Sequence, residues 1–171
     1  MPLLPAGPPA PVPLRVLGEA VDWTIVAIGA AMIVLVFLNV VFHLVGRDIA
    51  WTTEFSEFLM VWVTFLGGAA ASRRGLHMTI TEFVDKLGPV GRRLADGVIQ
   101  LLCLVILVLL GWYGTGIVNA TWGNELTVLH FPMAVQYLAL PVGAALMGVF
   151  TGWDLVQIVR GRSRAERYGA S

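Results

Sequence analysis

Residues 51–87 read WTTEFSEFLMVWVTFLGGAAASRRGLHMTITEFVDKL, and this stretch decides the fold. Its apolar run opens with Glu54 and Glu57 and ends at Arg73 and Arg74, a length that fits one membrane-crossing helix. Beyond the arginines, apolar residues recur at helical spacing among polar ones. This pattern predicts an amphipathic helix at about residues 77–88 that lies along the membrane surface.

The whole chain has the composition of an integral membrane protein. Of its 171 residues, 57% are hydrophobic and only 13% are charged. A bilayer core about 30 Å thick takes roughly 20 apolar residues per helix, and four runs reach this length, at about residues 23–45, 53–72, 97–118 and 132–158. We therefore predict an all-α integral membrane protein with four transmembrane helices in one membrane domain, residues 14–158. Pro141 is expected to kink the fourth helix, because it has no N–H to donate.

Positive charge is distributed unevenly along the chain. Arginines and one lysine cluster after the second and fourth runs, whereas residues 119–131 contain no Lys or Arg. Because basic loops stay in the cytoplasm, we predict that both termini and the second loop are cytoplasmic. Residues 1–13 are proline-rich and are expected to form a disordered tail. Residues 159–171 are expected to form a basic tail.

Two kinds of residue are expected to anchor the helices at the membrane interface. Aromatic side chains favour the headgroup region, and arginines at the ends of spans face lipid phosphates. The candidates are Trp23, Trp51, Arg73, Arg74, Phe83, Arg92 and Arg93.

Small residues on the second and fourth runs predict close packing of helices. Gly67 stands four residues before Ala71, and Gly68 four residues before Ser72. On the fourth run, a ribbon of small residues recurs every four positions: Ala144, Gly148 and Gly152. The two pairs on the second run fit packing within the chain and packing against a partner subunit equally well.

Glu54 and Glu57 lie three residues apart, on one face of the first turns of the second helix. One interpretation is that their charges complement the positive end of the helix. The other is that they form a polar anchor for a partner subunit or a docking protein. The candidate partner or scaffold interface therefore consists of Glu54, Glu57, Gly67, Gly68, Ala71, Ala144 and Gly148.

Residues of the kinds that carry catalysis are sparse. The sequence has no phosphate-binding glycine loop, no metal-ligand spacing and no nucleophile with a base partner. We predict that the protein is not an enzyme and binds no cofactor, metal or nucleic acid. His43 and His130, both expected at the outer side, leave open a haem between two axial histidines. Asn39 is expected to form a hydrogen bond to another helix.

Several segments, in their order along the chain, resemble the small membrane subunit of tripartite ATP-independent periplasmic (TRAP) transporters, the DctQ-like family. They are W-x-x-E-x-x-E (51–57), F-L-G-G-A-A-A (65–71), R-R-G-L-H (73–77), T-E-F-V-D-K-L (81–87) and F-P-M-A-V-Q-Y-L-A-L-P-V-G (131–143). Their order and the four-helix topology carry the resemblance over about residues 14–158. The tail at residues 1–13 has no counterpart in this pattern.

The resemblance implies a small permease subunit in the inner membrane of a bacterium, within a sodium-gradient-driven transporter for organic acid uptake. Such a subunit would pair with a large TRAP membrane subunit as a heterodimer, contact a periplasmic solute-binding protein transiently and lie in membrane lipid. It would act as a non-catalytic scaffold. Two alternatives stay open: a membrane anchor subunit of a respiratory or redox enzyme that binds haem, and a small exporter that assembles with itself.

Overall fold

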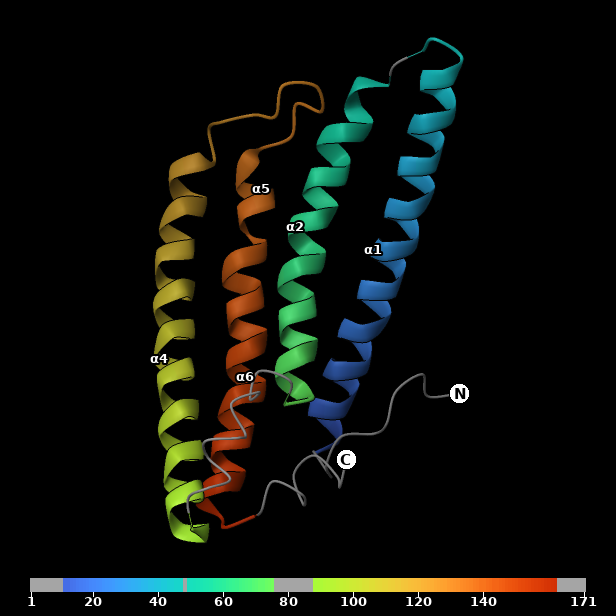
Figure 1. Cartoon of the computed structure of the whole chain (residues 1–171). Coiled ribbons are helices and arrows are strands. Elements are labelled where there is room, and N and C mark those ends of the chain that lie inside the picture. Colours follow the sequence, from blue (N-terminus) through green and yellow to red (C-terminus); the bar gives the residue numbers. More distant parts are fainter. Residues whose placement is uncertain (1–10, 48, 76–87, 163–171) are drawn as a thin grey trace.

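The computed structural model of the chain describes residues 11–47, 49–75 and 88–162. The helices are α1 (Val12–Leu44), α2 (Ala50–Arg73), α4 (Pro89–Thr121), α5 (Met133–Tyr137) and α6 (Ala139–Val159) (Figure 1). Four helical segments are long and apolar enough to cross a membrane, the last of them formed by α5 and α6 together. The prediction of an all-α protein with four membrane helices is confirmed for this part of the chain. The predicted surface helix, which includes Phe83, falls on residues outside the description.

Two helices begin earlier than the apolar runs indicated, and a proline lies in the first turn of each. Pro13 lies in the first turn of α1, and Pro89 is the first residue of α4. A proline fits there because the first N–H groups of a helix have no partner within the helix. Val12 and Pro13, which belong to the predicted tail at residues 1–13, are helical. Residues 1–10 of that predicted tail lie outside the description.

The last membrane segment is interrupted at Leu138, between α5 and α6. Pro141 follows one turn later and has no N–H to donate to the carbonyl of Tyr137. The bonds on either side remain: the N–H of Leu138 donates to Ala134 O at 2.9 Å, and the N–H of Val142 donates to Leu138 O at 3.1 Å. The distortion expected from Pro141 thus takes the form of this interruption.

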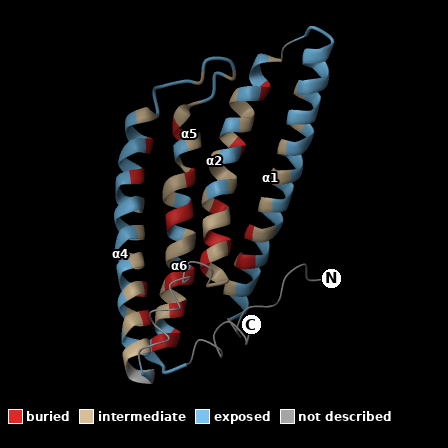
Figure 2. Cartoon of the chain, viewed as in Figure 1, coloured by how far each residue is buried: buried red, intermediate tan, exposed pale blue. Residues whose placement is uncertain are grey.

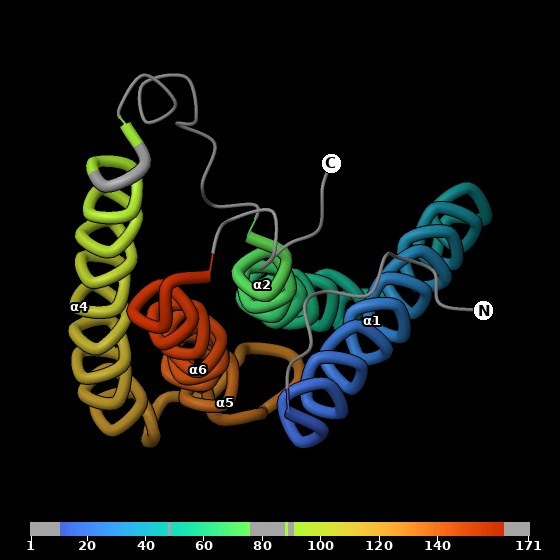
Figure 3. Tube along the Cα trace, turned by 90° about the horizontal axis from the view of Figure 1, so that it is seen from below, coloured from blue at the N-terminus to red at the C-terminus, as the bar shows by residue number. Residues whose placement is uncertain are grey.

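The membrane helices stand in a row, in the order α1, α2, α6, α4 (Figures 1 and 3). The starts of α1 and α4 and the ends of α2 and α6 lie together at one end, which we call the arginine end because Arg73, Arg74 and Arg93 belong to it (Figure 1). The opposite end, with the α1–α2 and α4–α5 connections, we call the loop end. The first membrane helix therefore begins, and the last one ends, at the arginine end.

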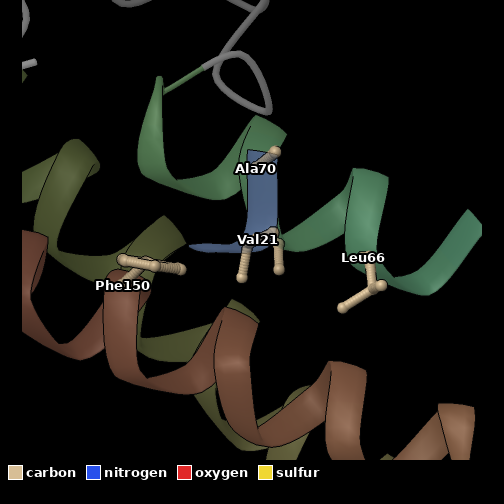
Figure 4. Close-up of a cluster of buried hydrophobic side chains, with 5 residues drawn as sticks. Val21, Leu66, Ala70 and Phe150 are labelled. Carbon is tan, nitrogen blue, oxygen red and sulfur yellow. The ribbon is translucent and has the colours of Figure 1, made fainter. Parts of the chain in front are cut away.

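The apolar core lies between α1, α2 and α6, and it is small. Val21 of α1, Leu66 and Ala70 of α2 and Phe150 of α6 are buried against one another (Figure 4). The alanine leaves room for α1 to come close to α2. Burial is concentrated on the two middle helices of the row, while the outer helices are largely exposed (Figure 2).

The exposed faces of α1 and α4 carry large apolar side chains. Examples are Ile33 and Phe37 on α1 and Ile106 and Leu109 on α4. These are side chains that lipid tails accept without cost. The two edges of the row are therefore suited to face lipid.

Candidate functional site

Helix α2 carries most of the residues that the sequence singled out, and one of its sides is packed against α6. A Cβ added at Gly68 would lie 2.9 Å from the Cε of Met147 on α6. A Cβ added at Gly143 of α6 would lie 2.6 Å from the Cβ of Phe65 on α2. The Phe65 Cβ is fixed next to the backbone, so Gly143 permits the close approach of α2 and α6. The Met147 Cε is the end of a flexible side chain and can move away from a Cβ at Gly68.

Gly67 points elsewhere, although it is the neighbour of Gly68. Among the described residues, no atom lies within 4 Å of the place where its Cβ would be, apart from its chain neighbours and the backbone of its own helix. Successive residues of a helix point about 100° apart, so Gly67 is turned away from α6, and Ala71 follows it one turn later. The two small-residue pairs therefore have different surroundings: Gly68 faces a neighbouring helix, and Gly67 faces open space.

A continuous strip of α2 is left uncovered by the described part of the chain, and we call it the open face of α2. Its members follow one another at intervals of four and three residues: Thr53, Glu57, Met60, Thr64, Gly67 and Ala71. The first four are exposed and the last two half-buried. A charged aspartate at the centre of a membrane helix costs about 3 kcal/mol against lipid. The Thr64 hydroxyl is satisfied by Met60 O at 2.7 Å within the helix, so it is the Glu57 carboxylate that makes this strip poorly suited to face lipid tails.

The two carboxylates of α2 have different surroundings. Glu54 accepts hydrogen bonds from the N–H of Val128, at 3.1 and 3.0 Å to its two oxygens, and from the N–H of Leu129 at 3.0 Å. Both partners belong to the loop between α4 and α5. Glu57 is exposed, and no hydrogen bond or ion pair joins it to the rest of the described residues. Glu54 therefore serves the chain's own fold, and Glu57 is left to face outward.

The loop that Glu54 holds is itself tightly folded. Leu126 N–H donates to Phe131 O at 2.8 Å, and Met133 N–H donates to Asn124 O at 2.8 Å. His130, with φ of +50°, lies inside this turn. Internal bonds and the Glu54 carboxylate together give the loop a fixed shape at the loop end of the row.

An ion-pair cluster joins α1 to α2 at the arginine end. Asp22 of α1 pairs with Arg73, and its second oxygen accepts from Arg74 Nη2 at 2.8 Å. The Arg73 side chain lies across Gly18, where an added Cβ would be 2.0 Å from Nη1. Both arginines turn toward Asp22, and an anchoring role toward lipid phosphates remains a prediction. Asp22 was not singled out, because nothing in the sequence links positions 22 and 73.

Arg93 joins α4 to the end of α6. Its Nε donates to Ile158 O at 3.1 Å and its Nη2 donates to Val159 O at 2.7 Å. These carbonyls lie in the last turn of α6, where N–H partners within the helix run out. Ile158 O also accepts from the N–H of Gly161 at 3.0 Å, and Arg93 adds a side-chain cap to this end of the helix. Arg92 beside it is half-buried. An anchoring role for either arginine toward lipid remains a prediction.

A strip of buried polar residues lies between α4 and α6, next to this cap. Gln100 Nε2 donates to Thr151 O at 3.3 Å. The buried members of the strip are Asp96, Gln100, Thr151, Asp154 and Gln157. Asp96 escaped the sequence interpretation because it precedes the apolar run that begins at about residue 97. Because α4 begins at Pro89, Asp96 lies within the helix rather than before it.

The remaining residues singled out by the sequence are spread over the row. Trp23 and Trp51 are 69% and 44% exposed, as an interfacial role requires. Ala144 is buried, with its Cβ 3.9 Å from the place of a Cβ at Gly111 on α4, whereas nothing lies within 4 Å of a Cβ at Gly148. Ala144 thus packs within the chain.

Asn39 joins α1 to α2 at the loop end, as expected. Its Oδ1 accepts a hydrogen bond from Thr52 Oγ1 at 2.9 Å. His130, one of the two histidines of the haem hypothesis, lies in the loop between α4 and α5, 3.9 Å from the Glu125 carboxylate.

Comparison with known proteins places the chain among transporter subunits. Residues 15–161 match the family described as tripartite ATP-independent periplasmic transporters, DctQ component. A protein of Haemophilus influenzae, provisionally named a TRAP transporter small permease protein, is 27% identical over 84% of this chain and 89% of its own length. The ectoine TRAP transporter small permease protein TeaB of Halomonas elongata is 29% identical over 68% of this chain and 64% of its own length.

A third relative is much longer than this chain. The isethionate TRAP transporter permease protein DctMQ of Oleidesulfovibrio alaskensis is 22% identical over 72% of this chain, and the match takes up 20% of that protein. These relatives give no support to the alternative of a haem-binding membrane anchor.

Proposed function

The chain belongs to the DctQ component family of the tripartite ATP-independent periplasmic transporters, and from this premise we propose that it acts as a non-catalytic scaffold for the large subunit of its transporter. The transporter would take up organic acids, driven by a sodium gradient. Within it, this small permease subunit would stabilise the large subunit in the inner membrane and help to seat the periplasmic solute-binding protein.

The row of helices is the observation that carries the scaffold role (Figure 3). A row of helices placed beside the large subunit makes the complex wider in the plane of the membrane. The apolar edges of the row on α1 and α4 suit the surrounding lipid. The bonded polar groups described above tie helices together at both ends: Asn39 with Thr52, Asp22 with Arg73 and Arg74, and Arg93 with the end of α6. The row is therefore built as a firm support.

The relatives' names support pairing with a large subunit. In the DctMQ protein, the matching region occupies 20% of a longer polypeptide named as a TRAP transporter permease protein. By analogy, this chain would pair with a separate large permease subunit as a heterodimer.

The loop that Glu54 holds supports the proposed seat for the binding protein. The positive-inside rule places the arginine end in the cytoplasm, with both flanks of the membrane domain there, and the loop end in the periplasm. Trp122 and Phe131 flank the loop and are 59% and 57% exposed. A loop of fixed shape with exposed aromatic side chains suits a transient protein contact.

Reconstitution tests the proposal. The chain, its large permease subunit and its binding protein are placed in proteoliposomes, and uptake of a panel of radiolabelled organic acids is measured with an inward sodium gradient. We expect uptake only with all three components and only while the gradient lasts. Full uptake without this chain would contradict the scaffold role, and uptake by this chain alone would favour a self-assembling transporter.

A further inference from the structure

The open face of α2 differs chemically from the other exposed faces of the row. On α1 and α4 the exposed positions are filled with large apolar side chains, while on α2 the exposed large apolar residues are Trp51 and Met60. The rest of the open face consists of a carboxylate, two hydroxyls and two small residues. The Thr64 hydroxyl already donates to Met60 O at 2.7 Å within α2, so the group that carries the argument is the Glu57 carboxylate. Lipid tails offer it no hydrogen bond, and a protein surface is the better neighbour.

We propose that the open face of α2 receives one transmembrane helix of the large permease subunit. Glu57 would accept a hydrogen bond from a donor on that helix, and Gly67 and Ala71 would let its backbone come close. The occupant is thus a helix with small residues toward the arginine end and an arginine, lysine, amide or hydroxyl donor toward the loop end. This inference rests on the proposed function, because it names the surface by which the small subunit holds its partner.

The depth of the polar residues supports a partner within the membrane. α2 has 24 residues and is thus about 36 Å long, only slightly longer than the roughly 30 Å core of a bilayer. Glu57 lies about 10 Å along this helix and Thr64 about 21 Å. A bilayer core of about 30 Å centred on α2 would put Thr64 near its middle and Glu57 about 8 Å inside its border. At that depth lipid supplies no hydrogen bond to the Glu57 carboxylate, so a partner protein would have to supply it.

A second copy of this chain fits the face less well. Two copies related by a two-fold axis along the membrane normal share the same orientation, so residues of equal depth meet, and a residue at the centre of the interface lies opposite its own counterpart. Glu57 would then face Glu57 of the other copy, and like charges repel strongly where water is excluded. A different chain with a donor at this depth avoids the repulsion.

Photo-crosslinking tests the inference in the assembled complex. Benzoylphenylalanine is introduced at Thr64, and separately at Ile106 on the apolar face of α4 as the control, with the large subunit co-expressed. We expect crosslinks from position 64 to the large subunit at least tenfold more often than from position 106. Equal crosslinking from the two positions would overturn the inference. Crosslinks from position 64 to a second copy, or within the chain, would overturn it as well.

A pair of glycine substitutions gives an independent measurement. Gly67→Leu fills the open face, and Gly116→Leu makes the same change on α4, where a Cβ also meets nothing within 4 Å. We expect Gly67→Leu to lower the amount of large subunit retained by the tagged chain at least tenfold and Gly116→Leu to leave it unchanged. Equal retention by both variants would overturn the inference while the proposed function stands. Failure of the unaltered chain to retain any large subunit would overturn both.

Discussion

The carboxylate of Glu54 in α2 binds the backbone N–H of Leu129, 75 residues further along the chain, at 3.0 Å. The same carboxylate accepts from Val128. One side chain of the second membrane helix thus fixes the position of the loop between α4 and α5. Glu57, only three residues later, makes no such contact within the described residues and faces outward.

Replacing Glu54 should release the loop. In Glu54→Ala the two amides lose their acceptor, and because Val128 is exposed, water takes over part of the bonding. We expect a loss of about 1 kcal/mol in stability and at least tenfold faster hydrogen exchange at Val128 and Leu129. Exchange measured by mass spectrometry in detergent tests this, with Glu57→Ala as the control. Unchanged exchange in Glu54→Ala would show that the loop keeps its shape by its internal bonds alone.

Replacing Asp22 should loosen the arginine end. The ion pairs of Asp22 with Arg73 and Arg74 are about a quarter exposed, so they are worth less than a fully buried pair. We expect Asp22→Ala to cost about 2 kcal/mol, visible as a lower melting temperature in detergent. The largely exposed pair of Arg15 and Glu19 supplies the comparison.

For that comparison, Arg15→Ala should change stability by less than about 0.5 kcal/mol. A double-mutant cycle between Asp22→Ala and Arg73→Ala isolates the coupling of the two side chains. A coupling energy near zero would mean that the arginines bind lipid phosphates or water instead of Asp22.

Two glycines of α6 should respond oppositely to the same change. A Cβ at Gly143 would lie 2.6 Å from Phe65, whereas a Cβ at Gly148 meets nothing within 4 Å. Gly143→Ala should therefore destabilise the chain by about 1–3 kcal/mol, because α2 and α6 must move apart. Gly148→Ala should be neutral or slightly stabilising, since alanine favours a helix more than glycine does. Thermal unfolding of both variants in the same detergent measures the difference, and equal stability would contradict the close contact of α2 and α6.

Glu57 should matter to assembly rather than to the fold of the isolated chain. Glu57→Gln keeps an oxygen that accepts a hydrogen bond, whereas Glu57→Leu leaves the donor of the large subunit without a partner in the membrane. We expect Glu57→Leu to retain at least tenfold less large subunit on the tagged chain and Glu57→Gln to retain most of it. Affinity purification in mild detergent compares them. Full retention by Glu57→Leu would place this carboxylate against water or headgroups.

The sequence predicted what depends on local composition. Runs of about 20 apolar residues predicted the number of membrane helices, and Pro141 predicted a distortion that appears at Leu138. The starts of α1 and α4 were missed because an apolar run shows only which residues are suited to the lipid core. A helix can extend beyond the lipid core into polar surroundings. Pro13, which was included in the predicted tail, lies in the first turn of α1, and Pro89 is the first residue of α4.

The contacts between helices depend on how each helix is rotated about its own axis. The sequence pattern does not give this rotation. Gly67 and Gly68 are adjacent glycines with the same small-residue spacing, yet only Gly68 meets Met147 of α6. Glu54 and Glu57 share a face in the sequence pattern, yet only Glu54 reaches the loop. Asp22 was overlooked for the same reason, since its partner Arg73 follows more than fifty residues later.

Native mass spectrometry tests the central claim most directly. The tagged chain is purified in mild detergent from membranes in which its large TRAP permease subunit is co-expressed, and the mass of the intact assembly is measured. A scaffold subunit predicts a complex of one copy of each chain. The chain alone, or an assembly of this chain only with itself, would contradict the account.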